Sequence, residues 1–225
     1  MKDNFIHVVF VIDSSGSMYG SEADVTGGFK RVVEEQKAVE NGSCVVSVID
    51  FNTQPEVVCI GQDVNDIDPD LDYATGGGTA LFDAIALGIK KAQEWNMSKA
   101  EIDRPEKTMM VIMTDGGENC SRDNNASMVK GMIKDYETEF GWSFVYLGAD
   151  LSNVEDADTL GIKSRGVSTK GMMTSNYDFV STVTTSFRNA TGDTHMKYAT
   201  MDNVMEAEMT SLNAQYSSAT GINIQ

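Results

Sequence analysis

The stretch Val8-Val9-Phe10-Val11-Ile12-Asp13-Ser14-Ser15-Gly16-Ser17-Met18 decides how the chain is read. Its first five residues are apolar and rich in β-branched side chains, which predicts a strand buried on both faces, as in parallel sheets. Asp13 ends this run, and Ser15 and Ser17 follow at a spacing of two. Gly16 allows the backbone to fold so that their side-chain oxygens converge. Hard oxygen donors suit Mg²⁺ or Mn²⁺ better than zinc, with Ca²⁺ as a further alternative.

Two later stretches also place a side chain with an oxygen atom next to a predicted strand or helix. Gly76-Gly77-Gly78-Thr79 places a threonine hydroxyl in a glycine-rich turn, directly before a segment with helical spacing of apolar residues. A second apolar run, 108–114, ends in Thr114-Asp115-Gly116. Each stretch therefore places an oxygen-bearing side chain beside an expected strand end or helix start.

Together the three motifs resemble the metal-ion-dependent adhesion site (MIDAS) of von Willebrand factor type A domains, over residues 5 to about 190. Any one of them recurs by chance, whereas three in the family's order are specific. The resemblance implies that a divalent ion, Mg²⁺ first, accepts an acidic residue of a partner protein. It also implies the metal ligands Asp13, Ser15, Ser17, Thr79 and Asp115. We expect a rim at Tyr19, Gly78, Glu118 and Asn119, for which ordinary surface loop positions are the alternative.

Strand and helix patterns alternate along the chain, which predicts an α/β fold with a doubly wound, mostly parallel sheet and helices on both faces. We expect six strands in the order 3-2-1-4-5-6. The third, at 56–60, is an antiparallel edge strand because the 52–55 connection is too short for a crossover. In this order the strand ends at Asp13 and Asp115 flank the switch point, where open α/β sheets bind ligands. Asn41-Gly42 predicts a left-handed cap for the first helix.

The 225 residues allow one large domain with a full core. We expect a von Willebrand factor type A domain at 1–190, closed by a helix at 177–187. The tail, 191–225, is expected to be partly helical or disordered, with 217–225 frayed.

A formal net charge of −17 argues against nucleic acid or an anionic membrane as the partner, and it also serves solubility. The N-terminus lacks the pattern of a signal peptide. Cys44, Cys59 and Cys120 are odd in number and lack metal-ligand spacing, which favours free thiols in a reducing compartment. We therefore expect a cytoplasmic protein of a bacterium or of a phage-infected cell.

The leading functional hypothesis is a non-catalytic, metal-dependent protein-binding module. The alternative is a metal-assisted hydrolase that uses the same cleft, since a bound Mg²⁺ can activate water. No Cys-His or Ser-His pairing is suggested, so no catalytic residue is assigned. Nucleotide-binding glycine motifs do not follow the first strand. The acidic stretch 63–72 fails as a calcium loop, because Leu71 and Gly77 stand where an EF-hand needs glycine and glutamate.

Overall fold

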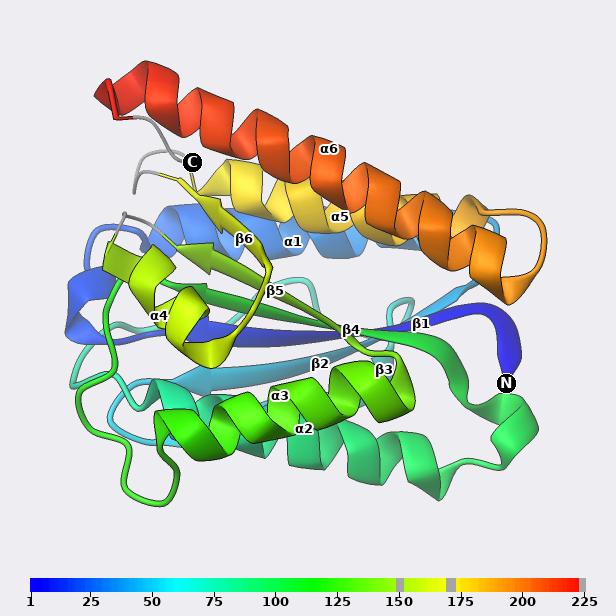
Figure 1. Cartoon of the computed structure of the whole chain (residues 1–225), viewed down its shortest axis with the longest axis horizontal. Coiled ribbons are helices and arrows are strands. Elements are labelled where there is room, and N and C mark those ends of the chain that lie inside the picture. The colour runs from blue at the N-terminus through cyan, green and yellow to red at the C-terminus, as the bar shows by residue number, and fades with distance from the viewer. Residues whose placement is uncertain (149–151, 169–172, 223–225) are drawn as a thin grey trace.

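A computed structural model describes residues 1–148, 152–168 and 173–222, and its centre is a six-stranded sheet (Figure 1). The strand order is β3-β2-β1-β4-β5-β6, as predicted. Only β3 runs antiparallel to its neighbour, β2. The strands are β1 (Lys2–Asp13), β2 (Ser43–Phe51), β3 (Pro55–Asp63), β4 (Pro105–Thr114), β5 (Ser143–Gly148) and β6 (Ser164–Val167).

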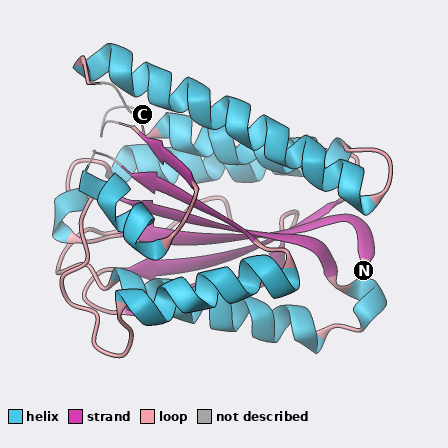
Figure 2. Cartoon of the chain, viewed as in Figure 1, coloured by secondary structure: helices cyan, strands magenta, loops and turns pink. Residues whose placement is uncertain are grey.

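Helices cover both faces of the sheet (Figure 2). One face packs against α1 (Glu22–Ala38), α5 (Thr174–Asn189) and α6 (Thr194–Thr220). The other packs against α2 (Leu81–Ser98), α3 (Ala126–Phe140) and α4 (Ser152–Leu160). Two 3-10 turns, η1 (Gly16–Met18) and η2 (Glu101–Asp103), lie in the connections. Within the described ranges, no helix combines the length and apolarity that crossing a bilayer requires.

The central strand β1 divides the core in two because its side chains alternate between the faces. Phe10 and Ile12 join the cluster under α1 and α5, whereas Val9 and Val11 join the one under α2 and α3. In the parallel register of β1 and β4, Ile12 lies opposite Met113. The strands therefore end level with each other, which brings the following residues of both to one edge of the sheet.

The predicted left-handed cap of α1 is wrong. The helix ends at Ala38, and Val39 is extended. Gly42 does have a positive φ of 63°, but in the turn into β2, where a side chain would collide with the main-chain oxygen of Asn4. The guanidinium of Arg188, on α5, donates hydrogen bonds to the carbonyl oxygens of Gln36, Val39 and Asn41 at 2.5, 2.8 and 3.1 Å. A distant arginine thus takes the place of a local glycine cap.

The C-terminal segment is more ordered than the sequence suggested. Helix α6 runs for 27 residues and buries Met201, Met205, Met209, Leu212 and Tyr216. A side chain at Gly166 of β6 would clash with Met209 and Leu212, so α6 lies directly on the edge strand. Residues 217–220, expected to fray, are helical because Tyr216 anchors the last turns and Gly221, with φ 74°, caps them. Residues 223–225 lie outside the described part.

Candidate metal centre

The loop after β1 is held in shape by its own polar groups. Asp13 is fully buried, and its Oδ1 accepts a 2.7 Å hydrogen bond from the main-chain N–H of Ser15. This is an Asx turn, in which an aspartate side chain accepts a hydrogen bond from the backbone N–H two residues later. It turns the chain where β1 ends. The hydroxyl oxygens of Ser15 and Ser17 lie 2.9 Å apart. Buried Met18 anchors the far end of the loop in the core.

Backbone hydrogen bonds fasten the glycine-threonine loop to this first loop. The N–H of Gly16 donates to the carbonyl of Gly77 at 3.1 Å, and that of Gly76 donates to the carbonyl of Ser14 at 2.8 Å. Gly77 has a positive φ of 78°, a conformation in which any other residue is strained. The loop places Thr79, which is 3% exposed, two residues before the start of α2.

The loop after β4 completes the arrangement. Thr114 donates a 2.5 Å hydrogen bond from its Oγ1 to Oδ2 of Asp13, and Asp115 follows it, almost buried. Asn119 accepts a 2.9 Å hydrogen bond at its Oδ1 from the N–H of Thr79, and its own N–H donates to the Thr79 carbonyl at 3.1 Å. The third loop therefore holds the second one in place through both main-chain groups of Thr79.

Three of the predicted ligands converge on a single point beside Gly116. A Cβ atom placed on Gly116 would lie 3.0 Å from Oγ of Ser17, 3.3 Å from Oγ1 of Thr79 and 3.8 Å from Oδ2 of Asp13. Ser15 adjoins Ser17 through the hydroxyl contact described above, and Asp115 precedes Gly116 in the chain. The space kept free by the glycine of the third loop is thus bordered by side-chain oxygen atoms from the other two loops.

Burial raises the pKa of Asp13 to about 6, against the opposing effect of the hydrogen bonds from Thr114 and Ser15. The nearby negative charge of Asp115 adds to the increase. A buried carboxylate next to a second carboxylate is costly unless a cation compensates it. The donor set of carboxylate and hydroxyl oxygens fits a hard divalent ion. In the described part of the chain, no cluster of three or more His, Cys, Asp or Glu side chains offers another metal site.

The predicted rim residues fall into two groups. Tyr19 is 80% exposed and stands directly after η1, and the N–H of Gly78 donates to Oγ1 of Thr53 at 2.9 Å. Asn119 and Glu118 instead support the loops. The carboxylate of Glu118 accepts hydrogen bonds from the N–H groups of Phe82 and Ser121 and from the Ser121 hydroxyl, at 2.6 to 3.0 Å.

Sequence reasoning gave no role to two residues that contact Asp13. Thr114 was visible in the motif, and aligning the ends of two neighbouring parallel strands would have placed it opposite Asp13. The hydroxyl of Tyr73, which lies between β3 and the glycine-threonine loop, donates to the carbonyl of Asp13. That contact spans 60 residues, and no local pattern signals it.

Comparison with known proteins identifies the family of this domain. A family model described as von Willebrand factor type A domain matches residues 7–185. No curated protein sequence matches the chain.

Solved structures share the fold at low sequence identity. Proximal thread matrix protein 1 from the mussel byssus, with a zinc-occupied MIDAS motif, has a TM-score of 0.55 and 15% identity, covering 80% of this chain and 46% of its own. A von Willebrand factor type A protein from Catenulispora acidiphila has a TM-score of 0.54 and 15% identity. The match covers 82% of this chain and 43% of that protein. The vWF domain of the type V pilus tip protein Mfa5 from Porphyromonas gingivalis has a TM-score of 0.58 and 10% identity. The match covers 84% of this chain and 97% of that domain. This chain thus spans less than half the length of the first two proteins.

Proposed function

The chain belongs to the von Willebrand factor type A domain family, and from this premise we propose that it is a non-catalytic, metal-dependent protein-binding module. The observation that carries the proposal is the convergence of Asp13, Ser17 and Thr79 oxygens around the space at Gly116. The ion is Mg²⁺, for which Mn²⁺ or Ca²⁺ can substitute. Its protein ligands are Asp13, Ser15, Ser17, Thr79 and Asp115.

A bound Mg²⁺ would supply a concentrated positive charge with a coordination position for an oxygen from outside the chain, because Mg²⁺ takes six ligands and five are proposed. The complementary group on the partner is the carboxylate of an aspartate or glutamate. At a net charge of −17 the chain repels an acidic partner at long range. The attraction must therefore act locally, within the roughly 10 Å over which charges interact in salt solution.

The surroundings of the site favour recognition of a protein. Tyr19 offers an exposed aromatic ring beside the serine loop, and tyrosine is enriched in protein interfaces. Asn119 and Glu118 keep the loops in position rather than facing the partner. The similar proteins include a byssus matrix protein and a pilus tip protein, which supports a binding role for this chain as well.

The positions of the histidines favour binding over hydrolysis. His7 lies within β1, with its two ring nitrogens 2.8 Å from Oδ1 of Asn96 and 2.7 Å from Oγ of Ser47. His195 belongs to the first turn of α6, where neighbouring Thr194 binds Glu106 near the start of β4. Both lie away from the strand ends that carry the metal ligands, so neither is placed to act as a base there.

The compartment that we propose is the cytoplasm of a bacterial or phage-infected cell. Cys44, Cys59 and Cys120 are all free thiols, which supports a reducing environment. The proposed compartment is argued from these cysteines alone and does not depend on the proposed metal-dependent binding.

Affinity capture tests the function. The immobilised chain is exposed to a lysate of its source cells in Mg²⁺, in EDTA and as the Thr79→Ala variant, with Thr138→Ala on α3 as a matched control. We expect a partner that is retained by the wild type and the control in Mg²⁺ only, and whose binding is lost when one of its own acidic residues is changed to the amide. A partner retained equally in all conditions contradicts the proposal.

A further inference from the structure

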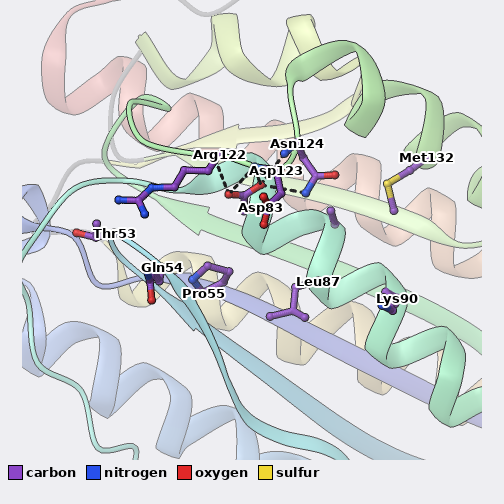
Figure 3. A pocket seen from close by; sticks show the side chains of 11 residues that line it. Thr53, Gln54, Pro55, Asp83, Leu87, Lys90, Arg122, Asp123, Asn124 and Met132 are labelled. Atoms are coloured by element: carbon purple, nitrogen blue, oxygen red, sulfur yellow. Dashed lines mark hydrogen bonds between the residues drawn. The ribbon is translucent and has the colours of Figure 1, made fainter.

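The outer side of α2 and α3 is grooved. One cavity, of about 720 Å³, lies toward the start of the two helices, with Leu87 of α2 and Met132 of α3 on its walls (Figure 3). A second cavity, of about 430 Å³, continues between the helices to Met97 and Tyr136. Met132 lines both cavities, so they form one groove. We call the outer surface of α2, η2 and α3, which Figure 1 shows on the outside of the molecule, the α2–α3 face.

Exposed apolar side chains gather at one end of this face. Met97 near the end of α2, Ile102 in η2 and Phe140 at the end of α3 are 51%, 73% and 46% exposed. The neighbouring parallel strands β4 and β5 begin soon after these segments, at Pro105 and Ser143, so the three side chains lie at the same end of the sheet. By contrast, α1 and α5 expose no large apolar side chain along their described lengths. Clustered exposed apolar surface marks a site of protein association.

The formal charges on this face nearly cancel. Residues 81–104, which comprise α2 and η2, carry four cations and four carboxylates, and α3 carries two cations and three carboxylates. The face thus accounts for one negative charge of the net −17. The acidity lies elsewhere: residues 63–72 contain five aspartates and α4 three carboxylates, with no cation in either segment. A second copy of this chain brings the same excess of negative charge, but it can approach the α2–α3 face with little repulsion.

A mixed pattern of charges also suits a contact between identical surfaces. In a two-fold symmetric dimer, a residue that meets a second residue of the other copy is matched by the reverse contact across the axis. A surface of one sign would repel itself, whereas cations and carboxylates on one face can pair in both directions. Lys90 and Glu94 both border the second cavity, beside Met97 and Tyr136. Both signs of charge therefore flank the apolar part of the groove.

The α2–α3 face is remote from the proposed metal site. Thr79 lies two residues before α2, whereas Met97 is the last residue but one of this 18-residue helix, which is about 27 Å long. Two helices side by side present roughly 25 by 20 Å, of the same order as the ~800 Å² that each partner buries in a standard interface. A dimer built on this face would have an interface of ordinary size and leave both metal-bearing edges uncovered.

We propose that the α2–α3 face binds the same face of a second copy of this chain, with the two-fold axis close to Met97 and Ile102. The apolar side chains at the axis pack against each other and enter the facing groove, and the surrounding lysines and carboxylates pair across the interface. The metal sites lie at the far ends of the helices, so each dimer presents two of them. Two sites strengthen attachment to a partner that displays its acidic residue repeatedly. Only this last consequence rests on the proposed function.

Sedimentation velocity of the full-length chain in EDTA, between about 1 and 100 µM, tests the inference, because interfaces of this size have dissociation constants in or below this range. We expect a dimer. Met97→Glu and Ile102→Glu each bring like charges together near the axis and should raise the dissociation constant about 30-fold or more, as for a central interface residue. Met196→Glu, at a 57% exposed position in the first turn of α6, is the matched control and should leave it unchanged.

A charge swap tests the two-fold arrangement. Met97→Lys alone should also dissociate the dimer, whereas an equimolar mixture of Met97→Glu and Met97→Lys chains should associate again. Failure of the mixture to associate overturns the placement of the axis. Thermal denaturation of each variant shows that lost association does not reflect unfolding.

The remaining outcomes separate the dimer from the metal site. A wild type that stays monomeric over the whole range, or a dimer that both Met97→Glu and Ile102→Glu leave intact, overturns the inference. A dimer that forms in Mg²⁺ but not in EDTA also overturns it, because a carboxylate of one copy would then occupy the metal of the other. Binding of Mn²⁺ by Met97→Glu should equal that of the wild type, so either proposal can fail while the other stands.

Discussion

Thr114 and Asp13 join the ends of the two central strands through a 2.5 Å hydrogen bond from the threonine Oγ1 to the aspartate Oδ2. The same Oγ1 accepts a 3.1 Å hydrogen bond from the Gly116 N–H and lies 2.9 Å from the Gly116 carbonyl oxygen. One hydroxyl thus fixes both the carboxylate proposed to bind the metal and the glycine that leaves room for the ion. Thr114 thus orients a proposed ligand without being proposed as one itself.

The first prediction follows from this contact. Thr114→Val keeps the shape of the side chain but removes the hydroxyl that holds Asp13 and the Gly116 turn. Residues that orient metal ligands typically contribute a factor of about 10 to 100 in affinity. We expect a loss of that size in Mg²⁺ affinity by isothermal titration calorimetry, with a folded protein. Thr138→Val, on the exposed side of α3, is the control. Equal affinities in both variants would show that Thr114 has no such role.

The second prediction concerns catalysis. With Mg²⁺ or Mn²⁺, the protein should not hydrolyse phosphate monoesters, nucleotides or carboxylic esters faster than the Asp13→Ala variant does. The site lacks a nearby histidine, and the ion's open position is proposed for a partner's carboxylate rather than for activated water. Metal-dependent turnover that disappears in Asp13→Ala would replace the binding module by the hydrolase as the better account.

The third prediction is a pH dependence of stability that comes from His7. Burial lowers the pKa of His7 from 6.5 to about 4, with the hydrogen bond to Asn96 opposing the shift. The folded protein holds the ring neutral, whereas the unfolded chain takes up a proton below pH 6.5. His7 therefore favours folding above pH 6.5, and this contribution is lost as the pH falls toward 4.

Comparison with His7→Gln isolates the effect, because every other group titrates alike in the two proteins. The advantage in unfolding free energy of wild type over variant should shrink by about 3 kcal/mol between pH 7 and 4. Urea denaturation in EDTA at a series of pH values measures it. A difference that stays constant over this range would mean that His7 titrates normally in the folded state.

The fourth prediction concerns Arg188, which is 3% exposed and supplies the hydrogen bonds at the end of α1. Arg188→Met preserves much of the apolar stem but removes the guanidinium donors to the carbonyls of Gln36 and Val39. Each such loss costs about 1 to 3 kcal/mol, so we expect a total of about 2 to 4 kcal/mol by chemical denaturation. Arg31→Met, at a half-exposed surface position, should cost less than about 1 kcal/mol. Equal losses would contradict the capping role.

The fold and the positions of the proposed metal ligands can be predicted from the sequence because both depend on local patterns. An apolar run that stops at Asp13 marks a buried strand and its end, and parallel strands bring their ends to one edge. The short connection at 52–55 likewise determines the antiparallel edge strand. Each of these inferences uses residues that are neighbours in the chain.

The features that escaped prediction depend on contacts between distant residues. Arg188 caps a helix that ends 150 residues earlier, and Tyr73 binds Asp13 across 60 residues. Helix α6 is stabilised along its length by burial on α5 and β6, which its own sequence does not reveal.

Binding of Mn²⁺, followed by electron paramagnetic resonance, tests the central claim most directly. The six-line spectrum of free Mn²⁺ weakens as the ion binds, so a titration gives both stoichiometry and affinity. We predict one bound ion per wild-type chain, competition by Mg²⁺, and no binding by Asp13→Ala, which removes half of the formal negative charge offered to the cation. Circular dichroism should show that the variant is folded. A wild-type protein that leaves free Mn²⁺ undiminished, or an Asp13→Ala variant with wild-type affinity, would contradict the account.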